Sequence, residues 1–191
     1  MIIGIGGSAS GSGKTTMAEE LLKALRRRAE GDFGVIKFTK TEIYTSVVTD
    51  DDTLFEEGKD TARMLKAGAR GAVWVRSPGG GELSEALGVA LQNLFGGRQP
   101  LRGVIVEGNS AIELLKPDIV IFMGGPCFKS GAEGVLRLAD VVYRPQGAHD
   151  IPEAPDAARK NAFFCGDIRA CVGAVLKLID EREGKGSSLS S

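Results

Sequence analysis

A single lysine lies within a run of small residues near the beginning of the sequence. The run SASGSGKTT occupies residues 8–16, between the apolar stretch MIIGIG and the amphipathic pattern MAEELLKALRRR. Residues without bulky side chains let the main chain curl so that its N–H groups point at an anion. Lys14 adds a positive charge, and a helix that begins here adds the positive end of its dipole. These residues suit the binding of phosphate groups.

The run differs from the strict Walker A pattern, GxxxxGK[ST], at one position. Gly13, Lys14 and Thr15 match the second half of the pattern, whereas Ser8 stands where its first glycine is expected and Gly7 precedes it. A flexible turn before a helix is the alternative, and the strand–loop–helix context disfavours it. We therefore predict that a nucleoside triphosphate, GTP or ATP, is bound by Ser10, Gly11, Ser12, Gly13, Lys14, Thr15 and Thr16.

A carboxylate ends one of the later apolar stretches. The stretch GVIVEG over residues 103–108 contains Glu107 at the position of a Walker B acid. A carboxylate there holds Mg²⁺ or polarises the attacking water, and an ordinary charged strand end is the alternative interpretation. We predict that Lys14 and Glu107 are catalytic and that Thr15 and Glu107 bind Mg²⁺.

Helical patterns alternate with short apolar runs along the chain, which is typical of an α/β fold. We predict a three-layer P-loop fold with a mostly parallel central sheet, formed by residues 1–183 as a single nucleotide-binding domain, with a disordered tail over 184–191. The predicted strands cover residues 2–5, 34–40, 72–76, 103–108, 118–123 and 141–144. The second strand brings Lys37, Thr39 and Lys40 to the edge where ligands of parallel sheets bind.

The segment between residues 41 and 58 is polar and too long for a simple connection. It contains the acidic run of residues 50–52, and Lys59 and Asp60 follow it. The pattern is equally consistent with a charged loop over the bound phosphates and with a solvated surface loop.

The composition is that of a soluble globular protein without a large basic surface. The 191 residues carry a formal net charge of −1, so we expect neither nucleic-acid nor membrane binding. Three cysteines without a CxxC pair favour a reducing, cytoplasmic location. We interpret His149 as a solvated loop residue, with a general base or metal ligand as the alternative, and Cys165 and Cys171 as core residues. Cys127 follows the fifth strand at the edge where ligands bind, so a functional thiol is the alternative to its interpretation as a small buried hydrophobic residue.

Four stretches together, SGSGKTT, GVIKFTK, GKDTARMLKAGA and GVIVEG, resemble the MobB family of molybdopterin-guanine dinucleotide biosynthesis adaptor proteins. The likeness covers residues 1–123, and a small residue also replaces the first glycine of the loop in that family. The resemblance implies a homodimeric GTP-binding protein with weak GTPase activity that assists a molybdopterin guanylyltransferase. It also implies that Lys37 and Asp60 lie near the nucleotide and that Glu107 lies near magnesium.

Other functional classes are compatible with the same loop. The loop also resembles those of nucleoside kinases, which transfer the γ-phosphate of ATP to a small metabolite, but a compact lid bearing arginines is missing from this sequence. A switch module whose 41–58 segment is ordered by bound nucleotide is a third class. A Rossmann dinucleotide site is disfavoured because its third glycine is missing and Lys14 would have no role. The preference for GTP follows from the resemblance alone, since the sequence has no NKxD motif.

Overall fold

The computed structural model describes residues 1–29, 31–97, 100–129, 131–145 and 162–184. Its centre is an eight-stranded sheet with the strand order β3-β4-β2-β5-β1-β6-β7-β8. Neighbouring strands are parallel except for β3 and β4, which are antiparallel. The strands are β1 (Ile2–Gly7), β2 (Phe33–Lys40), β3 (Ser46–Val48), β4 (Ala72–Ser77), β5 (Gly103–Glu107), β6 (Ile119–Met123), β7 (Val141–Tyr143) and β8 (Phe163–Cys165).

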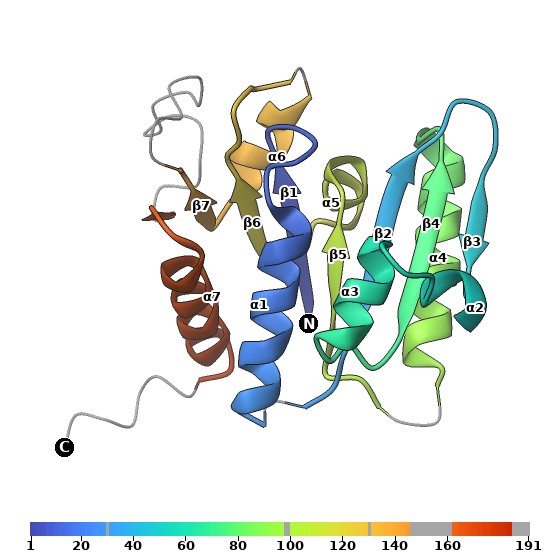
Figure 1. Ribbon diagram of the computed structural model, residues 1–191. Coiled ribbons are helices and arrows are strands. Elements are labelled where there is room, and N and C mark those ends of the chain that lie inside the picture. The colour runs from blue at the N-terminus through green and yellow to red at the C-terminus, as the bar shows by residue number, and fades with distance from the viewer. Residues whose placement is uncertain (30, 98–99, 130, 146–161, 185–191) are drawn as a thin grey trace.

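Helices cover both faces of the sheet, which gives the three layers that the sequence predicts. α1, α3 and α7 lie on one face, and α4, α5 and α6 lie on the other (Figure 1). The helices are α1 (Lys14–Arg27), α2 (Asp51–Leu54), α3 (Asp60–Lys66), α4 (Gly80–Phe95), α5 (Asn109–Leu115), α6 (Ala132–Leu138) and α7 (Ile168–Arg182). The predicted α/β class with a mostly parallel sheet is confirmed.

The central strand β1 is positioned by burial on both of its faces and at both of its edges. Ile3 and Ile5 are completely buried, and β1 pairs with β5 on one side and with β6 on the other. From β1 the chain runs through α1 to β2, which lies on the far side of β5. From β5 it later crosses to β6, on the other side of β1. The direction in which strands are added to the sheet therefore reverses at β1. Crevices at such reversal points are where open parallel sheets bind ligands. The residues that follow β1 and the end of β5 therefore meet at one edge.

Four short elements are absent from the predicted set. The polar segment 41–58, interpreted from its composition as a loop, contains the edge strand β3 and the single-turn helix α2. Helix α5 begins directly after β5, and β8 adds a parallel edge strand beside β7. A three-residue strand has little sequence pattern of its own, because its partner strand supplies most of its stabilisation.

Within the described residues, no helix has the length and apolar character needed to span a membrane. The final helix, α7, has Cys171, Val175 and Ile179 facing the core. His149 and residues 185–191 of the expected tail lie outside the described residues.

Candidate phosphate-binding site

The loop between β1 and α1 turns through two left-handed glycines. Gly11 has φ of 76°, and Gly13, the N-cap of α1, has φ of 85°. Both values lie in the region that a Cβ atom disfavours, so these two positions require the glycines that the motif supplies. With these two left-handed residues directly before α1, the backbone of the loop forms a concavity that can bind an anion at the N-terminus of the helix.

Ser8 stands where the Walker A pattern has a glycine, and its side chain lies beside Gly125. The Ser8 amide donates to the carbonyl of Met123 at 3.0 Å, and its carbonyl accepts from the Lys129 amide at 3.0 Å. Its side chain is buried, and a Cβ atom at Gly125 would lie only 3.1 Å from Ser8 Oγ. A serine is therefore tolerated here because residue 125 has no side chain, and the loop after β6 fixes the phosphate loop from behind.

Lys14 bends across the loop that precedes it. Its Nζ donates to the carbonyl of Ala9 at 2.7 Å and to Ser12 Oγ at 3.3 Å. Burial lowers the pKa of Lys14, and the charge of Glu107 opposes that shift. The ammonium group thus lies over the concavity, in contact with loop atoms that an anion could replace.

Four side chains from four different elements meet beside Lys14. Lys37 Nζ lies 2.5 Å from Glu107 Oε1 and 2.7 Å from Asp60 Oδ2, and Thr15 Oγ1 donates to Glu107 Oε2 at 3.1 Å. The Glu107 side chain is only 2% exposed. The register explains the central contact, because Lys37 is the direct cross-strand neighbour of Glu107. A carboxylate buried this deeply is stabilised by the ammonium and hydroxyl donors around it.

The charges in this cluster reinforce one another. Burial lowers the pKa of Lys37, but Glu107 and Asp60 outweigh it, and the pKa lies above the usual value. Burial raises the pKa of Asp60, but the hydrogen bond and charge of Lys37 outweigh it, and this pKa lies below the usual value. Lys37 and Asp60 therefore stabilise each other in their ionised forms.

The Lys37–Asp60 pair predicts a dependence of stability on pH. An unfolded aspartate has the higher pKa, 3.8, so the stability from ionised Asp60 is complete above that pH and is lost as pH falls through the lower folded-state pKa. We expect the free energy of unfolding, measured with urea between about pH 5 and pH 3, to fall more steeply for the natural protein than for Asp60→Asn. The exposed control Asp52→Asn should follow the natural protein, and parallel curves for all three proteins would contradict the prediction.

Thr15 and Glu107 are suited to hold Mg²⁺. A hydroxyl and a carboxylate oxygen 3.1 Å apart, at the end of the phosphate concavity, are oxygen ligands of the kind that Mg²⁺ takes together with phosphate oxygens. The described residues contain no group of three or more histidine, cysteine or acidic side chains that could hold a metal alone. Bound Mg²⁺ would neutralise the charge of the β- and γ-phosphates, and Thr15 and Glu107 would orient it.

The predicted residues line one cavity of about 720 Å³. Its lining includes Ser10, Gly11, Gly13, Lys14, Thr15, Thr16, Lys37, Asp60 and Glu107. Ser12 is the exception, since it is buried and lines a smaller cavity of about 260 Å³ on the other side of the loop. Thr39 and Lys40, expected near this edge, also line the large cavity.

Some charged or reactive residues do not join the site. Asp50 caps α2 by accepting from the Thr53 amide at 2.9 Å, and the acidic run 50–52 does not line the large cavity. Cys127 is exposed, so its interpretation as a buried hydrophobic residue is wrong, whereas Cys165 and Cys171 are buried as predicted. Gly124 and Gly125 after β6 are still buried, and the chain reaches the surface at Pro126 and Cys127.

Asn109 is a site residue that the sequence reasoning missed. Its Oδ1 accepts from the Gly7 amide at 2.9 Å, and its Nδ2 donates to the Gly7 carbonyl at 3.0 Å. These paired bonds join the first residue of α5 to the last residue of β1, immediately before the phosphate loop. The sequence offered one indication of this role for Asn109: it lies two residues after Glu107, at the edge of the sheet where the ligand is expected.

Replacing Asn109 by alanine is expected to destabilise the protein by about 2 kcal/mol, because both polar groups of Gly7 lose their side-chain partner. Urea denaturation measures this change. The matched control is Asn93→Ala on α4, whose exposed amide bonds only the Val89 carbonyl of its own helix. A control loss below about 0.5 kcal/mol is expected. Equal losses in the two variants would show that the bond to Gly7 has no special role.

The sheet order, the loop after β1 and the acidic end of β5 define the class of P-loop NTPases. A similar solved structure is HypB from Helicobacter pylori in complex with nickel, with a TM-score of 0.58 and 16% sequence identity over 99% of this chain and 91% of that chain. At this identity the likeness concerns the fold.

The family model described as molybdopterin guanine dinucleotide synthesis protein B, MobB, matches residues 2–124. This range is more than half of the sequence, and the chain therefore belongs to the MobB family. A comparison with curated proteins gives no significant match.

Proposed function

We propose that this protein binds GTP and Mg²⁺, hydrolyses GTP slowly, and acts as an adaptor in the guanylylation of the molybdenum or tungsten cofactor. The observation that carries the proposal is the convergence of Lys14, Thr15 and Glu107 on one cavity in a chain of the MobB family. The family description names guanine dinucleotide synthesis, which supports GTP over ATP.

Each residue of the cluster has a separate role in this proposal. The amides of the loop hold the phosphate oxygens, and Lys14 exchanges its contact with the Ala9 carbonyl for the β- and γ-phosphates. Thr15 and Glu107 orient Mg²⁺. Lys37 fixes the Glu107 carboxylate and lines the same cavity, and in this proposal it faces the γ-phosphate.

The same contacts support slow hydrolysis. One oxygen of Glu107 is bound by Lys37 and the other by Thr15, so this carboxylate is already engaged by two donors. A carboxylate that polarises an attacking water needs an oxygen directed at that water. Hydrolysis would accelerate when a partner rearranges the cluster or supplies a further group, as in other P-loop proteins.

The proposed partner is a molybdopterin guanylyltransferase, and the proposed assembly is a homodimer in the cytoplasm. The membership of the MobB family supports the partner. A γ-phosphate transferase is the second candidate, because a further cavity of about 260 Å³ shares Lys37, Thr39 and Asp60 with the phosphate cavity and offers room for an acceptor.

Measured turnover of GTP and ATP separates these functions. We expect slow phosphate release from GTP that rises when purified molybdopterin guanylyltransferase is added, and no such rise in the variant Lys14→Ala. Rapid transfer of phosphate to a small acceptor, with no effect of the guanylyltransferase, would overturn the adaptor role and establish the transferase.

A further inference from the structure

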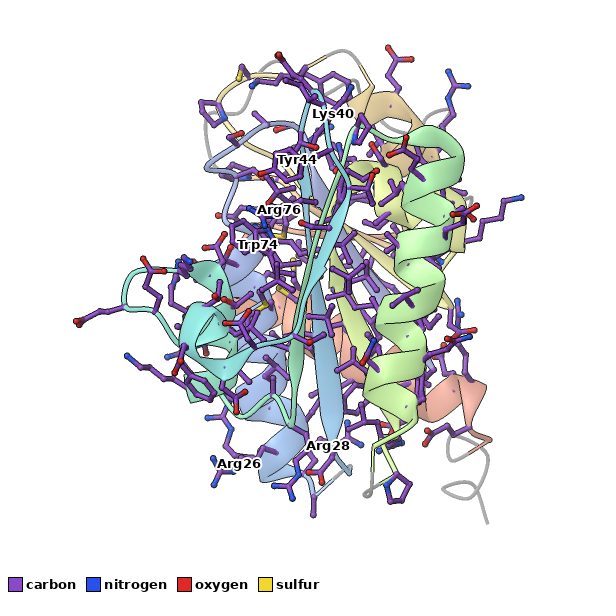
Figure 2. All side chains as sticks on the ribbon, turned by 90° about the vertical axis from the view of Figure 1, so that its right-hand side faces the viewer. Arg26, Arg28, Lys40, Tyr44, Trp74 and Arg76 are labelled. Carbon is purple, nitrogen blue, oxygen red and sulfur yellow. The ribbon has the colours of Figure 1, made fainter. Side chains whose placement is uncertain are left out.

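The face of the sheet that carries Glu107 and Lys37 continues as a polar surface toward the β3 edge. Trp74 of β4 is the cross-strand neighbour of Lys37. One row further along the strands, Thr39 of β2 is the neighbour of Arg76, which in turn pairs with Ser46 of β3. Because alternate residues of a strand share a face, these side chains all lie on the side covered by α1 and α3. Figure 2 shows Trp74, Arg76 and Tyr44 following one another along this side.

Arg76 is held in place by aromatic rings and hydroxyl groups. Its guanidinium carbon lies 4.7 Å from the centroid of the Trp74 ring and 5.1 Å from that of Tyr44. Its Nε donates to Ser46 Oγ at 2.9 Å, and its Nη1 donates to Tyr44 Oη at 3.1 Å. Neutral contacts of this kind orient a guanidinium without cancelling its charge.

The other basic residues nearby differ from Arg76 in their partners. Lys37 is paired with Asp60 and Glu107, Arg63 with Glu19, and Lys59 with Glu56. In the part of the chain that the structure describes, no carboxylate lies within ion-pair distance of Arg76. A half-buried, oriented and uncompensated guanidinium is a binding group for an oxyanion.

A cavity beside Trp74 adjoins the phosphate site, and Arg76 lies against the Trp74 ring that forms part of its lining. It measures about 260 Å³ and is lined by Lys37, Thr39, Gly58, Lys59, Asp60, Thr61 and Trp74. Trp74 is fixed by its Nε1, which donates to Thr39 Oγ1 at 3.0 Å, and Lys59 Nζ lies 5.2 Å from the centre of its ring. Thr39, which lines this cavity and the phosphate cavity, is also the cross-strand neighbour of Arg76.

We propose that this surface binds a second ligand, a small organic molecule with a phosphate or carboxylate group, beside the γ-phosphate end of the nucleotide. Arg76 binds the oxyanion, and the Trp74 ring forms a wall of the cavity. The proposal rests on the proposed function and extends it. Lys37 and Asp60 line both cavities, so binding of the second ligand would be coupled to binding of the nucleotide through these two residues.

Trp74 is the only tryptophan of the chain, so its fluorescence reports directly on this cavity. With the phosphate loop saturated by Mg²⁺ and a non-hydrolysable GTP analogue, titration with phenyl phosphate or benzoate should change the fluorescence in a saturable way. Arg76→Gln should weaken this binding about tenfold or more, since a hydrogen-bonded charge contributes about 1.5–3 kcal/mol. Arg76→Lys should restore part of the affinity. The control Arg137→Gln, exposed on α6 and paired with Glu133, should bind as the natural protein does.

The choice of ligands and the variant Lys14→Ala distinguish failure of this proposal from failure of the proposed nucleotide function. Tighter binding of phenyl phosphate identifies a phosphate ligand, tighter binding of benzoate identifies a carboxylate, and either supports the proposal. The variant Lys14→Ala, tested without nucleotide, should keep the response. Three results would overturn the proposal: equal affinity in Arg76→Gln and the natural protein, an equal response to neutral benzyl alcohol, or loss of the response in Lys14→Ala.

Discussion

Replacing Lys14 by alanine is expected to lower the affinity for Mg²⁺–GTP about 100-fold while leaving the fold intact. The variant removes the ammonium group that bends over the loop. A 100-fold loss of affinity corresponds to about 2.7 kcal/mol, which is the size expected for a charge-assisted contact with phosphate. The fold should persist because the two hydrogen bonds of Lys14 both lie within its own loop. Isothermal titration calorimetry measures the affinity, and urea denaturation checks the stability.

Lys23→Ala is the matched control for this measurement. Lys23 belongs to the same helix, but its ammonium pairs with Glu20 on the exposed side, at 2.7 Å. This variant should bind Mg²⁺–GTP as the natural protein does. If Lys14→Ala also binds with unchanged affinity, the loop is not the phosphate site.

Replacing Glu107 by glutamine is expected to weaken the response to Mg²⁺ far more than the binding of nucleotide. Glutamine keeps the volume of this buried side chain and can still accept from Thr15, but it removes the negative charge. We expect the apparent affinity for Mg²⁺ in the presence of GTP to fall about 30-fold, on the basis of about 2 kcal/mol for a charged partner. Nucleotide affinity in the absence of Mg²⁺ should change less than about threefold.

Two calorimetric titrations test this difference, one of Mg²⁺ into the protein–GTP complex and one of GTP in the presence of a chelator. Glu57→Gln, an exposed glutamate outside the large cavity, serves as the control and should leave both affinities unchanged. Equal losses of metal and nucleotide affinity in Glu107→Gln would mean that Glu107 supports the loop rather than the metal.

The sequence predicts the architecture well where the physical signal is local. The continuous apolar runs that became β5 and β6 are typical of strands covered on both faces, and both lie where the patterns place them. The loop motif predicted the start of α1 because Gly13 and Lys14 have fixed places in it. Elements of three or four residues, such as β3 and α2, carry too few residues for a periodic pattern and depend on their neighbours.

The site is partly predictable because parallel strands end at the same edge. Placing Lys14, Thr15 and Glu107 at that edge needed only the strand assignments and the rule for where ligands bind. The bonds of Lys37 to Glu107 and Asp60 depend on the register of β2 against β5 and on the position of α3. A register is set by packing across the whole sheet, so it does not follow from the local sequence. The Asn109–Gly7 pair was missed for the same reason.

A crystal structure with Mg²⁺ and a non-hydrolysable GTP analogue tests the central claim most directly, namely that the main chain after β1 encloses the triphosphate. The predicted result is phosphate oxygens within hydrogen-bond distance of the amides of residues 11–16, with Lys14 Nζ between the β- and γ-phosphates and Mg²⁺ on Thr15 Oγ1. Nucleotide bound elsewhere on the protein, with Lys14 still on the Ala9 carbonyl, would contradict it.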